Sequence, residues 1–383
     1  NPPYMGSSGM GTKLSDYVKK NYPDSKSDLF SCFIEKGNSM VKKNYYNCMV
    51  TMQSWMFLSS FETMRENIVN DKNITNLMHM ENMVMGIAFG TAVTIIRNSH
   101  LKDYNGTYNQ IKLVDIKQDE PKEFPVTGNR FARISTDNFS KIPGSPIAYW
   151  VSNGIAKSFK IGKTFNSIGS SRSGMQTGDN DIFLRFWFEV SFLNIKFDTK
   201  PEDNLMKIDK KWFPQPKGGS YRKWYGNFEY VVNYQSDGAD LKAFTGNSII
   251  KNPQFYFKEG VSWSHTTSKS FSGRILPSGC IFNVEAPSFF PNDNKTLLYI
   301  LAMANTKVLD SLFGIINQTM HYLAGDMAKI PIIESNDEQL VFTIKEYAKK
   351  NITLSKTDWD SFETSWDFKR HPLVDGAGSI SEA

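Results

Sequence analysis

Asn1-Pro2-Pro3-Tyr4 opens the chain and is followed by a run of small residues that ends at Gly11. Glycines in such a loop let the backbone approach a ligand closely. Downstream, hydrophobic periodicity predicts helices over 14–20, 28–42 (with Ser27 as its N-cap) and 57–69, and strands over 47–52, 74–78 and 92–96. That order is typical of the second half of an open α/β sheet, in which ligands bind at the carboxyl ends of the strands. The opening loop would then face the ligand crevice.

The composition of the 383 residues is that of a globular protein with two or three domains. Hydrophobic residues make up 40%, and because no run of 18 apolar residues occurs we expect no contact with a membrane. The three cysteines, Cys32, Cys48 and Cys280, are scattered, which fits a reducing cytoplasm and no metal-binding pattern. The five histidines show no paired spacing, so no metal site is predicted.

Charge is unevenly distributed along the chain. Residues 151–275 carry 18 basic and 11 acidic side chains, whereas residues 276–383 carry 9 basic and 14 acidic ones. Phosphate contacts supply most of the affinity for nucleic acids, so the basic middle is where a polyanion would be held. An ordinary solvated surface could carry the same excess of basic side chains, so charge alone does not distinguish a polyanion-binding region from such a surface.

The opening tetrad resembles the signature loop of amino-methyltransferases that use S-adenosylmethionine. The residue types suit that chemistry, because the exocyclic amine of adenine is a poor nucleophile whose lone pair is delocalised into the ring. The side-chain oxygen of Asn1 and the carbonyl of Pro2 can accept hydrogen bonds from the two N–H groups of that amine. Pro2 and Pro3 stiffen the loop, so these acceptors are positioned in advance. Tyr4 offers a flat face on which an extruded base can stack.

The flanking sequence makes the resemblance more specific. The chain is similar to the PglX family in runs that include NPPYMGSSGM, KSDLFSCFIEKG, MHMENMVMGIAFGTAVTIIRN, GSSRSGMQTGDNDIFLRFWFEV and GGSYRKWYGNFEYVVNY. That family comprises adenine-specific DNA methyltransferases of BREX phage-defence systems, akin to restriction-modification enzymes, and the resemblance covers nearly the whole chain. It implies the second half of a Rossmann-like S-adenosylmethionine-dependent methyltransferase sheet, followed by an α+β target-recognition domain with C-terminal helices.

The resemblance also implies roles for individual residues. The catalytic loop that binds the target adenine would consist of Asn1, Pro2, Pro3 and Tyr4. Phe89 would contact the flipped base from the side opposite Tyr4. The adenine ring of the cofactor, S-adenosylmethionine, would be bordered by Asp28, Leu29 and Phe30. From the residues alone, Phe89 also fits core packing at the start of a strand, and Asp28 fits a first-turn acid stabilised by the helix dipole.

The family's cofactor loop, a glycine-rich turn after its first strand, should precede the tetrad, and no glycine loop of that kind follows it. We therefore expect the chain to be the C-terminal part of a larger enzyme, truncated at the Asn-Pro-Pro-Tyr motif. Such a fragment should bind the cofactor poorly and should turn over only when its front half is supplied.

Loops in the middle of the chain interleave basic and aromatic residues. Lysine and arginine hold phosphates, whereas arginine, asparagine and glutamine read base edges. The predicted contacts with double-stranded DNA are Arg172, Gln176, Arg222, Lys223, Trp224, Lys269 and Arg274. Trp224 with Tyr225 also fits a buried aromatic corner, and Arg222 and Lys223 also fit a solvated surface.

These predictions divide the chain into half of a catalytic domain (1–110), a DNA target-recognition domain (111–333) and a helical, aromatic extension (334–383). The leading function is site-specific methylation of the 6-amino group of a flipped adenine in the cytoplasm. Its partners would be double-stranded DNA, the missing front half and other phage-defence proteins. The alternative is a DNA-binding recognition module without activity of its own. Methylation of RNA or of protein glutamine shares the tetrad but gives no reason for a large basic recognition domain.

Overall fold

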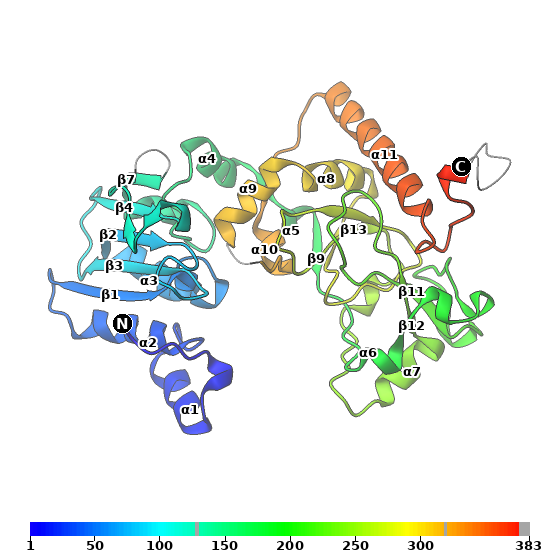
Figure 1. Cartoon of the computed structure of the whole chain (residues 1–383), viewed down its shortest axis with the longest axis horizontal. Coiled ribbons are helices and arrows are strands. Elements are labelled where there is room, and N and C mark those ends of the chain that lie inside the picture. The colour runs from blue at the N-terminus through cyan, green and yellow to red at the C-terminus, as the bar shows by residue number, and fades with distance from the viewer. Residues whose placement is uncertain (127–129, 318–319, 375–383) are drawn as a thin grey trace. The chain divides into compact units, whose positions relative to one another are not determined.

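The computed structural model describes residues 1–126, 130–317 and 320–374, and these residues form two compact units (Figure 1). The first unit contains residues 1–161 and 315–317, and the second contains residues 162–314 and 320–374. The sequence placed boundaries at 110 and 333. The sheet of the first unit continues past residue 110, because the strand formed by residues 131–135 pairs with residues 105–109.

The first unit is built around a five-stranded sheet in the order β1-β3-β2-β4-β7. Strand β3 is antiparallel to both β1 and β2, β4 is parallel to β2, and β7 is antiparallel to β4. Strands β1, β2 and β4 therefore end at the same edge. The strands are β1 (Tyr46–Met52), β2 (Asn73–Met80), β3 (Thr91–Arg97), β4 (Asn105–Ile111), β5 (Ile116–Lys117), β6 (Glu120–Pro121) and β7 (Phe131–Ser135). The helices are α1 (Thr12–Asn21), α2 (Leu29–Met40), α3 (Glu62–Asp71) and α4 (Asn153–Ile161).

The predicted strands of this unit and its first two helices are confirmed. Two helix starts differ from the prediction. The N-cap of α2 is Asp28 rather than Ser27, because the Asp28 carboxylate accepts from the backbone N–H of Phe30. Helix α3 begins at Glu62 rather than at 57, because the preceding residues form short 3-10 turns that bury Trp55.

The segment 99–110, for which no strand is predicted from the sequence, contributes most of β4. Gly106 lies so close to β2 that a Cβ there would be 2.2 Å from the carbonyl oxygen of Ile74. Tyr108 is fully buried, and its hydroxyl donates to that same carbonyl oxygen at 3.3 Å. A glycine and a hydrogen-bonded tyrosine thus occupy positions where a hydrophobic pattern would show aliphatic residues.

A buried arginine fixes the turns between β1 and α3. Arg65 is 1% exposed, and its guanidinium donates to the carbonyl oxygens of Trp55 (2.8 Å), Leu58 (2.6 Å) and Gly144 (2.8 Å). Burial lowers the pKa of Arg65 to about 10, so the group is charged at neutral pH. Four hydrogen bonds from this guanidinium thus satisfy three carbonyl groups in turns.

The second unit contains two antiparallel sheets, ordered β14-β13-β15-β9 and β10-β12-β11, and a two-stranded pair, β16-β8. Its strands are β8 (Lys163–Thr164), β9 (Gly169–Arg172), β10 (Leu184–Phe186), β11 (Trp212–Gln215), β12 (Tyr230–Asn233), β13 (Gly260–Trp263), β14 (Gly273–Leu276), β15 (Ser288–Pro291) and β16 (Pro331–Ile332). The helices that follow α4 are α5 (Phe165–Ile168), α6 (Asn180–Phe183), α7 (Gln235–Ala243), α8 (Leu297–Ala304), α9 (Lys307–Ile316), α10 (Ala324–Lys329) and α11 (Glu338–Asp360).

The long helix α11 packs along α8 within the second unit and buries Trp359 (Figure 1). The residues after α11 return to the same unit, where the ring of Trp366 lies 5.2 Å from that of Phe197 and 6.0 Å from that of Phe228. The described part of the predicted C-terminal extension is therefore integral to the second unit rather than a separate arm.

Within residues 1–126, 130–317 and 320–374, no single helix has the length and apolar composition of a membrane span. The segments 294–304 and 307–316 reach that composition only as a pair, and they are bent by 81° at the break between them. The same residues contain no cluster of three or more histidine, cysteine or acidic side chains that could hold a metal ion.

Replacing Arg65 with methionine should lower the free energy of unfolding of the first unit by about 3 kcal/mol, because several buried carbonyl groups lose their donor. Native-state hydrogen exchange of the amides in β1 and β3 measures this loss. Arg133, which is exposed on β7, provides the control, and Arg133→Met should change the free energy by less than about 0.5 kcal/mol. Equal effects of the two substitutions would contradict the structural role of Arg65.

Candidate functional site

The opening loop places Tyr4 beside the carboxyl-terminal part of β1, where its hydroxyl lies 3.5 Å from the carbonyl oxygen of Val50 and its ring packs against the hydrophobic core. The Tyr4 hydroxyl donates to the side-chain oxygen of Asn1 at 2.7 Å. The Tyr4 ring meets that of Phe89 edge to face at 5.4 Å and that of Phe30 at 6.1 Å. Asn1 is exposed and Tyr4 is half-buried, and burial raises the pKa of the Tyr4 phenol. The fold thus brings Phe89, which is distant in the sequence, against Asn1 and Tyr4 of the opening loop, and all three residues are predicted to bind the target base.

Asp28 ties this loop to helix α2. One of its carboxylate oxygens accepts from the backbone N–H groups of Met5 (3.0 Å) and Phe30 (3.3 Å), so Asp28 caps the helix and holds the loop at once. The backbone N–H of Leu29 adds a hydrogen bond to the carbonyl of Met5 at 2.9 Å. The helix-terminal role of Asp28 is therefore present in the structure, and its place beside the cofactor stays a prediction.

A hollow of about 340 Å³ lies beside the loop, between α1 and α2. Its lining is largely apolar and includes Pro3, Leu14, Val18, Leu29 and Phe33. Of the three residues predicted to border the cofactor, Leu29 lines this hollow, whereas Phe30 is fully buried in the core. Phe33 is 42% exposed and was not singled out from the sequence. Its spacing of four residues from Leu29, on the same face of a helix, is the signal that could have found it.

Gln53, which follows β1, is hydrogen-bonded to Gly90, the residue that follows Phe89 in the chain. Its backbone N–H donates to the carbonyl of Gly90 at 3.0 Å, and the Gln53 side-chain oxygen is hydrogen-bonded to Nε2 of His79. Nδ1 of His79 is 3.3 Å from the hydroxyl of Tyr149. His79 is 1% exposed, and burial lowers its pKa to about 4. Sequence reasoning missed these residues because no local motif links them.

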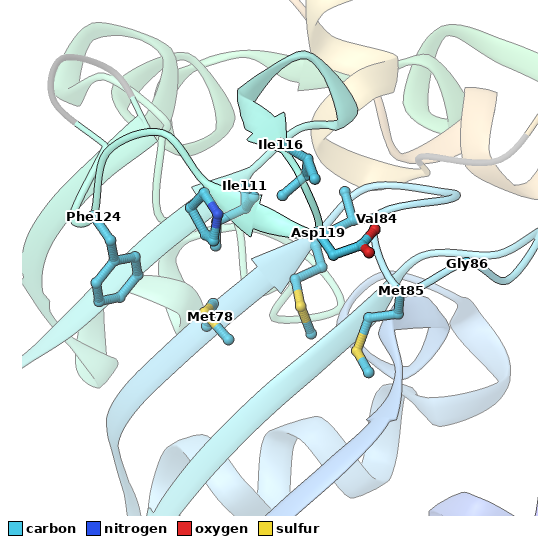
Figure 2. Close-up of a pocket in the computed structure, with 10 residues that line it drawn as sticks. Met78, Val84, Met85, Gly86, Ile111, Ile116, Asp119 and Phe124 are labelled. Carbon is cyan, nitrogen blue, oxygen red and sulfur yellow. The ribbon is translucent and has the colours of Figure 1, made fainter.

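A larger hollow, of about 670 Å³, lies at the carboxyl ends of β2 and β4. Figure 2 shows Met78 of β2, Met85 of the connection between β2 and β3, and Phe124 around it, with the carboxylate of Asp119 at its rim. The other lining residues are apolar or glycine. No residue predicted for the site lines this hollow, but it borders the connection that contains Phe89.

Three of the predicted DNA-contact residues present side chains at the surface of the second unit. Lys269 is exposed, with its ammonium group 5.4 Å from the centre of the Tyr221 ring. Arg172 is half-buried at the end of β9, an outer strand, with its guanidinium 5.4 Å from the centre of the Phe255 ring. Gln176 lines a polar hollow of about 360 Å³. Contact of these three residues with DNA stays a prediction.

Two other predicted contact residues are engaged with helices of their own unit. The guanidinium of Arg222 pairs with the carboxylate of Asp358 on α11 and lies 5.1 Å from the centre of the Trp359 ring. The ammonium group of Lys223 donates to the carbonyl oxygen of Asn305 at 2.9 Å. Neither side chain is a freely solvated surface charge, and DNA contact at either position would compete with these interactions.

Trp224 and Arg274 pair through their backbones rather than projecting together toward solvent. Trp224 is half-buried, and its neighbour Tyr225 is 8% exposed, which fits the aromatic corner left open by the sequence. Arg274 is 2% exposed and donates to the carbonyl oxygen of Gly218 (3.3 Å) and the hydroxyl of Ser264 (3.1 Å). Because its donors are turned inward, the predicted direct contact between Arg274 and DNA is corrected to a structural role.

A family model described as Eco57I restriction-modification methylase matches residues 1–84. The adenine-specific methyltransferase BrxX of Escherichia coli O9:H4 (strain HS) is 37% identical to this chain over 390 residues. The adenine-specific methyltransferase PglX of Lacticaseibacillus casei (strain Zhang) is 36% identical over 390 residues. These alignments cover 100% and 98% of this chain but 31% and 32% of the relatives, so the chain spans about a third of their length.

Among solved structures, the Type IIL restriction-modification enzyme MmeI in complex with DNA is similar in fold, with a TM-score of 0.57. The match covers 100% of this chain and 51% of that chain, at 14% sequence identity. At this level of identity the similarity concerns the fold alone.

The burial of His79 predicts a loss of stability in mild acid. Its pKa in the folded protein, about 4, lies below the ordinary value of 6.5, so the unfolded chain binds a proton first as the pH falls. Neutral His79 therefore contributes to the free energy of unfolding above pH 6.5, and this contribution is lost as the pH falls toward 4. The free energy of unfolding should decrease by about 2 kcal/mol between pH 7 and pH 5. Hydrogen exchange of β2 amides at the two pH values measures it. His79→Phe should flatten this dependence, whereas His371→Gln, a half-buried histidine outside this unit, should leave it unchanged.

Proposed function

The chain belongs to the PglX family of adenine-specific methyltransferases, and we propose that it methylates the 6-amino group of a specific adenine in double-stranded DNA. S-adenosylmethionine would be the methyl donor, and the setting would be phage defence of the restriction-modification type. The proposal rests on the grouping of Asn1, Tyr4 and Phe89 at the carboxyl end of β1. As the chain spans about a third of its relatives, it would act within a longer enzyme.

The order of the first sheet supports the reading of this unit as the second half of a Rossmann-like methyltransferase sheet. Strands β1 and β2 run in the same direction and are separated by the antiparallel β3. The tetrad lies at the carboxyl end of β1, the edge at which open α/β sheets bind ligands. The front half of the sheet, with a glycine-rich cofactor loop, would complete the crevice.

The loop would activate the adenine amine through positioned acceptors. The carbonyl oxygen of an asparagine side chain has two lone pairs, and in Asn1 one of them accepts from the Tyr4 hydroxyl. The second is available for one N–H of the amine, and the carbonyl oxygen of Pro2 would take the other. Because the amine then donates twice, its lone pair is directed toward the incoming methyl group, and the prolines hold both acceptors in advance.

The aromatic pair would hold the extruded base. A base stacked parallel to the Tyr4 ring would be perpendicular to the Phe89 ring, because the two rings lie at 89° to each other. Phe89 would therefore contact the base edge to face while Tyr4 stacks on it. Extrusion itself is required because the amine is otherwise engaged in the base pair within the duplex.

The residues beside Pro3 fit a nucleoside such as that of S-adenosylmethionine, which supplies an electrophilic methyl group on its sulfonium sulfur. The hollow of about 340 Å³ is largely apolar, and Leu29 and Phe33 line it together with Pro3. A flat purine ring would be held there by apolar contact on one side of the loop, while the target base lies on the Tyr4 side. Pro3 and Tyr4 are adjacent, so the loop would separate the two ligands.

The second unit would recognise the DNA sequence. Lys269 and Arg172 provide positive charge, and Gln176 lies in a polar hollow with donors and acceptors suited to a base edge. The basic balance of residues 151–275 supports a polyanionic partner. The DNA seen with MmeI is a property of that enzyme, and its fold similarity makes DNA the first ligand to test.

Substituting Asn1 or Tyr4 with alanine in the complete natural protein should lower kcat for methyl transfer to duplex DNA by at least about 100-fold, because the positioned acceptor or the stacking face is lost. Transfer of a radiolabelled methyl group measures the rate, and restriction mapping locates the product adenine. Tyr45→Ala and Asn21→Ala, two exposed residues of the same types, should leave kcat unchanged. Full activity of the Asn1 and Tyr4 variants would show that the site lies elsewhere.

The same assay separates the alternatives. A protein that binds duplex DNA but transfers no methyl group in its complete form would be a recognition module without activity of its own. Preferential methylation of single-stranded RNA, or of a glutamine-containing peptide, would assign the tetrad to another amino-methyltransferase class.

Phe33→Ala should raise the dissociation constant for S-adenosylmethionine by about tenfold, because one apolar wall of the hollow is removed. Phe33 is 42% exposed, so the substitution should leave the fold intact. Isothermal titration calorimetry measures the binding. Phe124→Ala, at another exposed phenylalanine of the same unit, should leave cofactor affinity unchanged, and an equal loss in both variants would place the cofactor elsewhere.

A further inference from the structure

The position of Phe89 depends on the residue that follows it. Phe89 is the second-last residue of the connection between β2 and β3, and on one side this connection borders the hollow of about 670 Å³ (Figure 2). Val84, Met85 and Gly86 of the connection line that hollow, so packing on that side does not fix the end of the connection. Gly90, the residue next to Phe89, is held instead by Gln53.

Gln53 holds Gly90 through a backbone hydrogen bond and through close contact with its side-chain amide. The Gln53 backbone N–H donates to the Gly90 carbonyl at 3.0 Å. The side-chain amide lies against the Gly90 Cα so closely that a Cβ on Gly90 would be 2.4 Å from the Gln53 Cδ. The Gln53 amide therefore fills the space beside Gly90 and, together with the backbone hydrogen bond, sets the position of Gly90 and of the adjacent Phe89.

The conformation of the Gln53 side chain is itself fixed by a buried polar chain, defined here as Tyr149, His79 and Gln53. An amide oxygen only accepts, so its hydrogen bond with Nε2 of His79 requires the proton on Nε2. Nδ1 then accepts from the Tyr149 hydroxyl at 3.3 Å, which selects that tautomer. The rings of Phe57, at 5.9 Å, and Trp150, at 6.2 Å, pack around the imidazole and exclude water.

The register of the sheet places this polar chain at the site. His79 of β2 and Thr51 of β1 both pair with Ala92 of β3, two residues after Gly90. Gln53 lies two residues beyond Thr51, directly after the last residue of β1. The polar chain therefore links the carboxyl ends of β1 and β2 to the start of β3, which follows Phe89 directly after Gly90.

We propose that Tyr149, His79 and Gln53 are positioning residues that set the Phe89 ring for contact with the extruded adenine. The inference rests on the proposed function and deepens it, because it assigns to buried residues of the core the geometry of the base-holding aromatic pair. None of the three needs to touch the base. Their effect on methyl transfer passes through Gly90 to Phe89.

The test measures kcat at saturating cofactor and DNA, and the affinity for duplex DNA, in the complete natural protein. Tyr149→Phe and Gln53→Met should each lower kcat by about tenfold, since small displacements of positioning groups slow the chemical step. The dissociation constant for DNA should change less than about threefold, because the contacts with the duplex are untouched. Combined with Phe89→Ala, neither substitution should reduce kcat further, since all act through one side chain.

Two further measurements separate positioning from a loss of stability. Tyr108→Phe removes another buried hydroxyl of the same core, one bonded to the carbonyl of Ile74, and should leave kcat unchanged. With 2-aminopurine at the target position, Gln53→Met should alter the fluorescence of the bound base in the same direction as Phe89→Ala.

Additive losses in the double variants, or an equal loss in Tyr108→Phe, would overturn the positioning inference while methyl transfer by the wild-type protein upholds the proposed function. A wild-type protein that transfers no methyl group to adenine would overturn the proposed function itself. Tyr149→Phe is the decisive variant, because it keeps the ring and its packing and removes one hydroxyl.

Discussion

A single carboxylate holds the functional end of this molecule together. Asp28 accepts hydrogen bonds from the backbone of Met5, in the opening loop, and from Phe30, in the first turn of α2. One oxygen thus satisfies a donor at the helix terminus and a donor in a loop that has no regular structure beyond a short 3-10 turn. Two more hydrogen bonds, from the N–H of Leu29 to the carbonyl of Met5 and from the N–H of Ser7 to the carbonyl of Ser27, join the same loop to the start of α2. The Tyr4–Asn1 hydrogen bond and the Tyr4–Phe89 contact are made by the loop that these interactions hold in place.

The interior of the first unit is more polar than its hydrophobic core suggests, and the polar groups lie where the chain must be held without regular hydrogen bonding. Arg65 donates hydrogen bonds to carbonyl groups in the turns after β1. His79 is hydrogen-bonded through Nε2 to the side-chain oxygen of Gln53, directly after the same strand. Both buried groups carry costs of desolvation, which lower the pKa of each. A site at the ends of strands needs such groups, because the sheet ladder stops there and its last carbonyl and N–H groups must find partners elsewhere.

In the second unit, basic residues divide into those that face solvent and those that the fold uses internally. Lys269 is exposed, whereas Arg222 is paired with Asp358, and Arg274 is buried against backbone carbonyl groups. The acidic C-terminal region thus supplies a partner for part of the basic middle region. A count of charges along the sequence therefore gives more positive charge than the surface presents to a polyanion, because some basic side chains are paired or buried within the unit.

The sequence by itself determined the tetrad, the strands around it and the family, because these depend on short motifs, on local hydrophobic periodicity and on similarity along the whole chain. It could not show β4, where Gly106 and Tyr108 replace the expected aliphatic residues, nor the inward turn of Arg274. Only the tertiary structure brought Phe89 against Tyr4 and linked Tyr149 to Gln53 through His79. Those contacts join residues separated by 26 to 85 positions, and no local pattern records which side chains will meet when strands from different parts of the chain end at one edge.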